Sequence, residues 1–186
     1  MPRAFDILLA ALALAILSPL LLVAAIAIKL TSSGPVVYRQ RRVGRGGREF
    51  EMWKLRTMVQ GSDPIGVGRV VYRDDPRVTA PGRLLRRTSL DEIPNLVNVL
   101  RGEMAIVGPR PTIKAQVDDY TPHQKRRHEV LPGITGWAQV QGRAGMPWEE
   151  RIELDVWYVE HRSLGLDARI LARTARLLLT GHGLYG

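Results

Sequence analysis

An almost unbroken apolar run near the N-terminus constrains this chain more than any other feature. Residues Ile7 to Ile28 include no charged side chain, and Ser18-Pro19 interrupts them at their middle. As one straight helix that rises about 1.5 Å per residue, such a run would reach across a hydrocarbon core of about 30 Å. The run therefore predicts a segment that lies in a membrane.

Three arrangements of this segment are compatible with its length and composition. A cleaved signal peptide is disfavoured, because the apolar run continues past Pro19 and meets Lys29 without a convincing cleavage site. A simple transmembrane span is the default from hydropathy. The third arrangement is a helix bent at Ser18-Pro19 that enters one leaflet and returns to the same face. Proline removes a backbone hydrogen bond, and Ser18 can satisfy the freed carbonyl. The residues alone leave the last two open, since proline kinks also occur in true spans.

The charge of the whole chain points to an anionic partner. Its 186 residues, enough for one domain, contain 27 Lys and Arg against 18 Asp and Glu, a net charge of +9. Such a surplus suits a nucleic acid, a phosphorylated substrate or a lipid headgroup. The chain has no cysteine, which excludes a disulfide framework and a thiolate metal site.

Several local patterns predict secondary structure around the rest of the chain. The β-forming residues after Gly34-Pro35, the glycine-rich turn at 44–47 and residues 49–55 predict a β-hairpin. The basic stretch 112–129 is interpreted as a solvated segment. Residues 166–180 alternate arginines with apolar residues, which favours an amphipathic helix on anionic lipid.

Two adjacent carboxylates, Asp91 and Glu92, lie between a basic run and Pro94. Proline is tolerated in the first helical turn, so a helix is predicted to begin between Ser89 and Asp91 and to end at Gly102. Its expected apolar face is Ile93, Leu96, Val97 and Leu100. Ser89 and Glu92 also have the spacing of a capping box, which is the structural alternative to catalysis at the positive end of a helix.

The Gly-Pro-Arg-Pro turn that ends at Pro111 favours the catalytic interpretation. It stiffens the backbone around Arg110, whose guanidinium suits a phosphate. Arg86, five residues before Asp91, is the choice for a second phosphate contact, with a surface or headgroup contact as the alternative. Acids, a helix N-terminus and fixed arginines together describe a magnesium–phosphate site.

The stretch from Thr88 to Pro111, TSLDEIPNLVNVLRGEMAIVGPRP, resembles the signature of the bacterial sugar transferases. These are the monotopic polyprenyl-phosphate phosphoglycosyl transferases, here in a small catalytic-core form. The resemblance extends over nearly the whole chain. Its other pieces are Ser18-Pro19, the Lys-Leu-Arg-Thr-Met segment from Lys54, DDPRVT at 74–79 and PGITGWAQVQGR at 132–143. In the last piece, Gln141 stands where the family more often has Asn.

The resemblance implies an α/β, mostly helical fold in a monotopic membrane protein. Residues 1–31 would form a re-entrant membrane helix broken at Ser18 and Pro19. Residues 32–186 would form a catalytic domain with a small β-hairpin and amphipathic interfacial helices. This domain would lie on the cytoplasmic face of the bacterial inner membrane, in contact with the lipids of the inner leaflet.

The implied reaction moves a phospho-sugar from a UDP-sugar to polyprenyl (undecaprenyl) phosphate, releases UMP and begins glycoconjugate synthesis. Asp91 and Glu92 are the expected catalytic residues, and Asp91 is the expected ligand of Mg²⁺. Polyprenyl phosphate is already anionic and barely needs a base, so Asp91 is predicted to attack as a nucleophile and Glu92 to support it. The expected substrate-binding residues are Lys54, Arg86, Arg110 and Arg143.

Two other functions compete with this one. A membrane-tethered basic adaptor would bind anionic lipid or nucleic acid, but it has no reason to hold an Asp-Glu pair near Gly-Pro-Arg-Pro. A glycosyltransferase with a soluble donor would release UDP instead of UMP. We therefore expect no nucleic-acid partner. The sequence sets neither the sugar nor the oligomeric state, and a homodimer is left open.

Overall fold

A computed structural model of the protein describes residues 1–62, 75–142 and 146–180. The α-helices are α1 (Arg3–Thr31), α2 (Ala80–Arg87), α3 (Asn95–Arg101), α4 (Lys114–Asp118), α5 (Pro122–Lys125), α6 (Trp137–Gln141), α7 (Trp148–Glu160) and α8 (Leu164–Thr180). Short 3-10 turns are η1 (Arg45–Gly47), η2 (Leu90–Glu92) and η3 (Arg126–Glu129). The strands are β1 (Val37–Val43), β2 (Glu49–Leu55), β3 (Ala105–Val107) and β4 (Gly133–Thr135). The fold is mostly helical with small sheets, as predicted.

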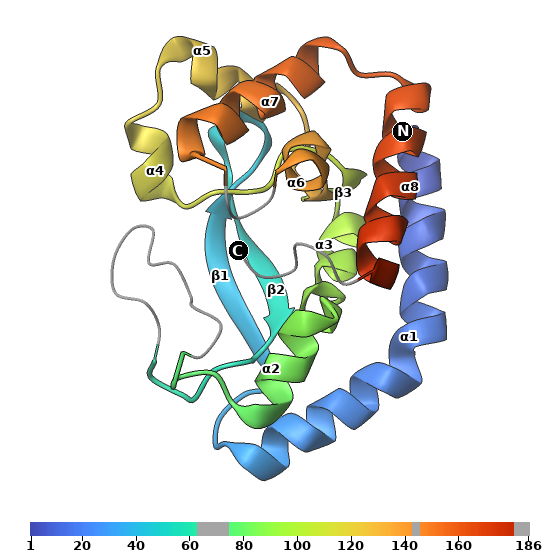
Figure 1. Ribbon diagram of the computed structural model, residues 1–186, viewed down its shortest axis with the longest axis vertical. Coiled ribbons are helices and arrows are strands. Elements are labelled where there is room, and N and C mark those ends of the chain that lie inside the picture. Colours follow the sequence, from blue (N-terminus) through green and yellow to red (C-terminus); the bar gives the residue numbers. More distant parts are fainter. Residues whose placement is uncertain (63–74, 143–145, 181–186) are drawn as a thin grey trace.

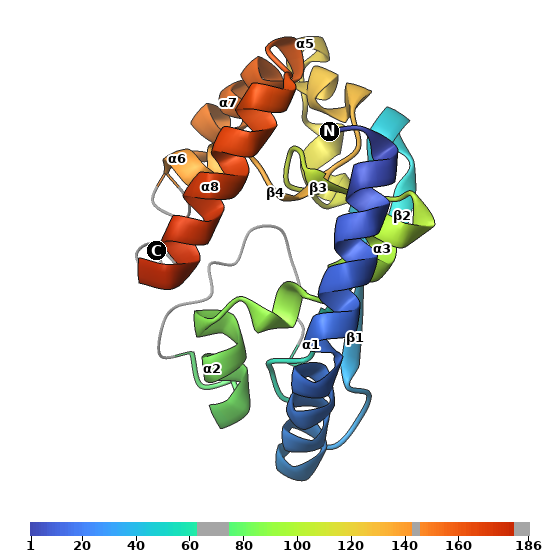
Figure 2. The same cartoon turned by 90° about the vertical axis from the view of Figure 1, so that its right-hand side faces the viewer.

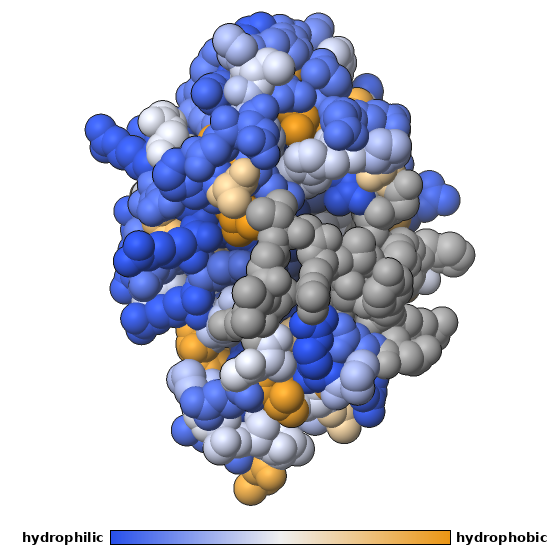
Figure 3. Space-filling view, turned by 90° about the vertical axis from the view of Figure 1, so that its left-hand side faces the viewer, coloured by the Kyte–Doolittle hydropathy of each residue, from blue (hydrophilic) through white to orange (hydrophobic). Residues whose placement is uncertain are grey.

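The long helix α1 carries most of the exposed apolar surface. Within the described residues, it is the one helix whose length and composition would suffice to cross a bilayer. Side chains such as Leu8 and Leu22 are each 64% exposed. Figure 3 shows a different side of the molecule, the left-hand side of Figure 1, where hydrophilic residues predominate. The apolar surface is therefore concentrated along α1.

Helix α1 is continuous but bent near its middle (Figure 1). Pro19 lies inside the helix and cannot donate a backbone hydrogen bond to the carbonyl of Ala15. The Ser18 hydroxyl donates to that same carbonyl at 2.8 Å, so the freed acceptor is satisfied locally. The expected break at Ser18-Pro19 thus takes the form of a kink without loss of the helix.

The N-terminal turn of α1 is hydrogen-bonded to the end of α3 and to strand β3. Arg3 donates to the carbonyl oxygens of Val99 and Met104, the latter at 2.8 Å. The buried carboxylate of Asp6 accepts from the backbone N–H of Ile106 at 3.1 Å. Ala10 is fully buried in one cluster with residues of β2 and α3. The first half of α1 is therefore part of the domain core.

The other end of α1 contacts the same body of the protein. Ile28, which is 1% exposed, packs in a cluster with Leu55 of β2 and Leu85 of α2. The Arg56 guanidinium donates to the carbonyl oxygen of Ser32 at 2.8 Å, just after the helix ends. Both ends of α1 therefore lie against one domain, and the bend between them is consistent with that arrangement.

The predicted hairpin is confirmed as β1 and β2, which pair antiparallel with Val37 opposite Leu55. Gly46 in the connecting turn has a φ of 67°, a conformation that favours glycine. Helix α3 lies beside this hairpin, because the buried Asn98 side chain accepts from Trp53 N at 3.0 Å and donates to Glu51 O at 2.6 Å. The hairpin and the segment that carries the two acids are thus joined by side-chain to backbone bonds.

The predicted start of the helix after the acids is wrong. Ser89 has a left-handed φ of 56° and makes no capping hydrogen bond, so there is no capping box. Leu90–Glu92 form the 3-10 turn η2, and α3 begins only after Pro94. A helix N-cap has extended backbone angles, so the left-handed Ser89 cannot serve as the N-cap of a helix that contains the acids. The end at Gly102, with a φ of 86°, is as predicted.

The predicted apolar face of α3 is only partly correct. Leu96 is buried as expected, but Leu100 is 40% exposed and Val99 is fully buried. The buried side of α3, which faces α1 and β2, carries Val99 together with the polar residues Asn95 and Asn98. Hydrophobic periodicity counts such asparagines as polar and so places the buried face incorrectly.

Strands β3 and β4 form a short parallel pair that leads into the Gly-Pro-Arg-Pro turn. A Cβ on Gly108 would lie 2.4 Å from Leu131 O, so glycine is required where the two backbones approach. Behind this pair, Tyr158 of α7 and Ile170 of α8 are buried in one cluster with Val107. Figure 2 shows α8 and α1 as separate columns with β3 and β4 between them.

The predicted amphipathic helix near the C-terminus is α8. Its inner side buries Leu166 and Ile170, while Leu179 is 88% exposed. One of its arginines has a protein partner, since Arg173 donates to Gln141 Oε1 at 2.6 Å. The expected contact of α8 with anionic lipid stays a prediction.

Substitution of Asp6 tests whether the start of α1 is part of the domain core. Asp6→Ala leaves the Ile106 N–H without its acceptor and should lower the free energy of unfolding by about 1–3 kcal/mol. The control is Asp118→Ala, because Asp118 is 56% exposed and should cost less than about 0.5 kcal/mol. Denaturant unfolding in detergent micelles measures both. Equal effects of the two changes would contradict the packing described for α1.

Candidate active site

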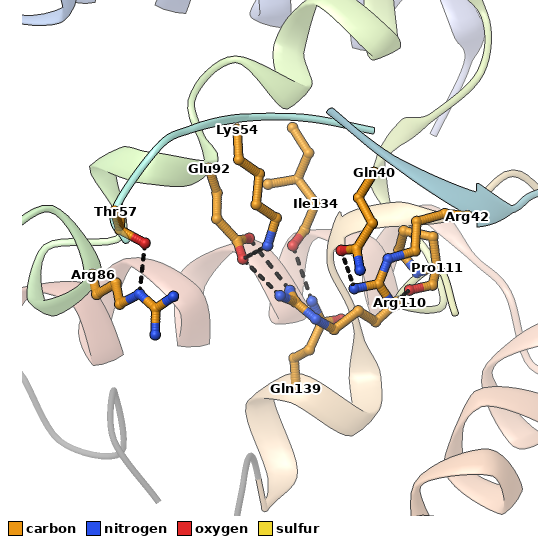
Figure 4. Close-up of polar contacts among 10 residues, drawn as sticks. All are labelled: Gln40, Arg42, Lys54, Thr57, Arg86, Glu92, Arg110, Pro111, Ile134 and Gln139. Carbon is orange, nitrogen blue, oxygen red and sulfur yellow. Dashed lines mark hydrogen bonds and ion pairs between the residues drawn. The ribbon is translucent and has the colours of Figure 1, made fainter. Parts of the chain in front are cut away.

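The predicted site residues Lys54, Glu92 and Arg110 lie together in one ion-pair group (Figure 4). Lys54 Nζ, at the end of β2, lies 2.8 Å from Glu92 Oε1. Arg110, which follows β3, donates to both carboxylate oxygens of Glu92, at 2.6 and 3.3 Å. Three segments that are far apart in the sequence therefore meet at one carboxylate.

The two adjacent acids have opposite electrostatic environments. Burial raises the pKa of Asp91 to about 6, with a further increase from Glu92, against the lowering effects of Lys54 and Arg86. Burial also acts to raise the pKa of Glu92, but Arg110 and Lys54 outweigh it and hold that pKa far below its usual range. Glu92 is therefore a fixed anion that holds two cations. Asp91 is the acid whose charge is least compensated.

Arg86 lies on the Asp91 side of the site. Its Nε donates to Thr57 Oγ1 at 2.8 Å, and its charge lowers the pKa of Asp91. Helix α2 is held against the end of β2, since Thr79 N donates to Thr57 O at 3.0 Å. A Cβ on Gly82 would lie 2.0 Å from the same carbonyl oxygen, so no larger residue fits. The structure thus places Arg86 near Asp91, and its contact with a phosphate stays a prediction.

Arg42 is a site residue that the sequence reasoning missed. Its guanidinium donates to Gln40 Oε1 at 2.7 Å and approaches Pro111 O at 3.5 Å (Figure 4). Burial and the nearby charge of Arg110 lower the pKa of Arg42 to about 10. Strand alternation could have found it, because Gln40 and Arg42 share a hairpin face with Lys54, whose partner in the register is Tyr38.

The interpretation of residues 112–129 as a solvated basic segment is wrong for Arg127. Arg127 and Asp155 of α7 are each 3% exposed and form a buried ion pair. Arg127 also donates to the backbone carbonyl of Arg110 at 2.8 Å. A run of basic residues does not show which one turns inward. Lys125, two positions earlier, is exposed as predicted.

A pocket of about 610 Å³ opens beside this group. It extends from Glu92 and Arg110 towards α6, α7 and α8, and it combines polar and apolar walls. Its lining includes Arg42, Thr112, Gln116, Ile134, Gln139, Trp148 and Arg151. Gln139 is held in place by a bond from its Nε2 to Ile134 O at 2.9 Å. The remaining predicted contact, Arg143, lies outside the described residues.

The described residues contain no cluster of three or more His, Asp or Glu side chains that could hold a metal ion. The Glu92 carboxylate is already paired with Lys54 and Arg110, so Asp91 is the member of the acid pair that could bind a metal ion. Mg²⁺ is commonly held by one or two carboxylates together with substrate phosphates and water. A partly buried carboxylate with an elevated pKa fits a magnesium ion that binds together with a diphosphate.

The sequence is similar to known proteins over almost its whole length. The family model described as bacterial sugar transferase matches residues 1–181. The chain is 43% identical to the uncharacterized sugar transferase EpsL of Bacillus subtilis, covering 98% of this chain and 89% of that protein. It is 45% identical to the UDP-glucose:undecaprenyl-phosphate glucose-1-phosphate transferase of Caulobacter vibrioides, covering 98% of this chain and 71% of that protein.

A third relative is longer than this chain. The UDP-N-acetylgalactosamine-undecaprenyl-phosphate N-acetylgalactosaminephosphotransferase of Aeromonas hydrophila is 43% identical over 97% of this chain, but only 44% of that protein is covered. The chain therefore belongs to the bacterial sugar transferase family and is a transferase enzyme. The resemblance inferred from the motifs is confirmed, and nothing in these relatives supports the basic adaptor.

Titration of Asp91 tests the contrast between the two acids. In metal-free protein the carboxyl of Asp91 should titrate at about 6, so it is protonated below that value and charged above it. Glu92→Gln removes a negative neighbour, and the pKa of Asp91 should therefore fall towards its ordinary value. Carbon-13 NMR of labelled aspartate carboxyls follows both titrations. Glu51→Gln is the control, because Glu51 is 55% exposed on the hairpin and should leave Asp91 unchanged.

A pKa of Asp91 that is ordinary in the wild type, or that rises in Glu92→Gln, would contradict this electrostatic description.

Proposed function

We propose that this protein transfers a phospho-sugar from a UDP-sugar to polyprenyl phosphate and releases UMP, which initiates a glycoconjugate. The names of the Caulobacter and Aeromonas relatives describe reactions of this type. The observation that carries the proposal is the division of the acid pair. Glu92 is occupied by Lys54 and Arg110 and lines a pocket with basic walls, while the adjacent Asp91, which is not among the residues that line this pocket, keeps an elevated pKa.

The transfer would take place in two displacements. In the first, an Asp91 carboxylate oxygen bonds to the sugar-linked phosphorus, and the bond from this phosphorus to the UMP oxygen breaks. UMP leaves with that electron pair, and an aspartyl phospho-sugar remains. In the second, an oxygen of polyprenyl phosphate attacks the same phosphorus and restores the free carboxylate. No proton has to be removed from an acceptor that is already anionic.

The basic residues would reduce the repulsion between Asp91 and the diphosphate. Arg110 is 46% exposed, so its guanidinium can contact phosphate oxygens while it stays bonded to Glu92. Arg86 would contact the phosphate on the Asp91 side, and Arg143 stays a proposed contact to the nucleotide. Glu92 orients Lys54 and Arg110, and its low pKa argues against a role in proton transfer.

Asp91 would also hold Mg²⁺ together with the donor diphosphate. When bound, the ion would neutralise phosphate charge and so favour departure of UMP. The supporting observation is the partly buried carboxylate of Asp91, whose raised pKa indicates that the protein cations leave part of its charge uncompensated.

The proposed setting is the cytoplasmic face of the bacterial inner membrane. Residues 1–31 would form a re-entrant helix, and residues 32–186 the catalytic domain. This arrangement is supported by the kink at Pro19 and by the contacts of both ends of α1 with the same domain. A transmembrane span would have to break the bonds of Arg3 and Asp6. A re-entrant anchor would keep the site at headgroup depth, where a soluble donor can meet a lipid phosphate.

A single-turnover experiment tests the chemistry. Protein mixed with Mg²⁺ and a panel of UDP-sugars, without polyprenyl phosphate, should release about one equivalent of UMP per enzyme. Radiolabel from the active sugar should stay on the denatured protein. Asp91→Asn should abolish both signals, whereas the exposed Asp118→Asn should keep them. If UMP appears only with polyprenyl phosphate and no label is retained, a single displacement replaces this mechanism.

Single-cysteine labelling tests the topology, and the absence of native cysteine removes background. Ala4→Cys and Ser33→Cys place thiols at exposed positions near the two ends of α1. In intact spheroplasts both should be protected from an impermeant reagent, and both should react after lysis. Pro19→Leu, which restores a backbone donor for Ala15, should let a fraction of molecules expose position 4 to the outside. Labelling of position 4 alone in the wild type would exclude re-entry.

A further inference from the structure

A buried polar cluster behind the Gly-Pro-Arg-Pro turn has no role in the steps described above, although two of its members, Arg127 and Asp155, line the pocket. It consists of Arg127 of η3, Asp155 of α7 and Tyr120, all at most 6% exposed. We propose that the Arg127–Asp155 pair is a positioning device that sets the direction of the Arg110 guanidinium. This inference rests on the proposed function, in which Arg110 contacts the donor diphosphate.

The backbone around Arg110 is fixed by contacts to three successive carbonyl groups. Arg127 Nη2 donates to Arg110 O at 2.8 Å, and Arg42 approaches Pro111 O at 3.5 Å. The next carbonyl, of Thr112, accepts from Val43 N at 2.7 Å. Pro111 also restricts the backbone conformation of the residue before it. With its main chain held in this way, the Arg110 side chain has few directions left, and the one adopted reaches Glu92.

Arg127 can act as a fixed donor because both terminal nitrogens of its guanidinium are bonded, while its buried Nε has no hydrogen-bond partner in the described structure. Its Nη2 also pairs with Asp155, and its Nη1 donates to Tyr120 OH at 2.7 Å. The rings of Tyr120 and Trp148 lie 5.7 and 5.8 Å from its guanidinium carbon. A planar fork can bind these acceptors at once, whereas the single ammonium of a lysine cannot. The guanidinium of Arg127 therefore links Asp155 of α7 to the backbone of Arg110.

A purely structural role makes a different prediction. A buried ion pair often adds little net stability and can be replaced by apolar residues of similar size. If Arg127 and Asp155 served only stability, their effect on catalysis would be independent of Arg110. If they act through Arg110, their effect should largely disappear once the Arg110 side chain is removed.

A double-mutant cycle tests this difference. Asp155→Asn and the paired change Arg127→Met with Asp155→Leu are each made in the wild type and in Arg110→Ala. The paired change keeps a folded variant available if a single one leaves an uncompensated charge and unfolds. We measure kcat and KM for UMP release with polyprenyl phosphate and an active UDP-sugar. In the wild-type background kcat should fall about 10- to 100-fold, and in Arg110→Ala the further fall should stay below about twofold.

The matched control is Arg126→Met, which changes the neighbouring arginine on the same turn. Arg126 forms an ion pair with Glu160 at the surface, 41% exposed, and its loss should alter kcat less than about twofold. Equal falls in kcat in both backgrounds, or a paired variant with wild-type kcat, would overturn the positioning role. An Arg110→Ala enzyme with wild-type kcat and KM would instead refute the phosphate contact assigned to Arg110 under the proposed function.

Discussion

The arrangement of the site depends on one carboxylate shared by two cations. Glu92 accepts from Lys54 at the end of the hairpin and from Arg110 after β3, while it is itself carried by the turn before α3. Because these three segments come from distant parts of the chain, the ion pairs fix their mutual position where the pocket begins. The stability of such a partly buried group depends on all its members, since removal of one leaves the others uncompensated. Glu92 is therefore better described as the organising residue than as a reacting one.

The same segments are connected to the long N-terminal helix. Asp6 accepts from the backbone of β3, Arg3 donates to the end of α3, and the other end of α1 packs against β2 and α2. The elements next to the predicted catalytic and binding residues, namely β2, α2, α3 and β3, thus lie against α1. In the proposed membrane setting, this arrangement would hold Asp91 at a constant depth relative to the lipid headgroups. Its carboxyl, with the elevated pKa, and the basic walls of the pocket would there be within reach of both substrates.

Much of this site could be predicted from the sequence, for reasons that differ between residues. The hairpin and α1 follow from local patterns. Arg110 could be grouped with the acids through the stiff turn that carries it and Arg86 through its closeness in sequence, whereas Lys54 needed the family resemblance. The start of α3 could not be predicted, because it depends on the left-handed conformation of Ser89, which no local pattern indicates. Arg127 and Asp155 lie 28 positions apart, and neither charge pattern nor periodicity indicates that they pair in the interior. The sequence patterns do not indicate which charged residues are buried against partners that are distant in the chain.

The central claim is that the two adjacent acids have separate roles, with Asp91 reacting and Glu92 holding the cations. Peptide mass spectrometry after incubation with Mg²⁺ and an active UDP-sugar, without polyprenyl phosphate, tests it most directly. The account predicts that the peptide spanning residues 91–92 gains the mass of one phospho-sugar, that fragmentation assigns it to Asp91, and that Glu92→Gln still forms some of this adduct. A phospho-sugar on Glu92, or no adduct on either carboxylate in an enzyme that turns over, would contradict the account.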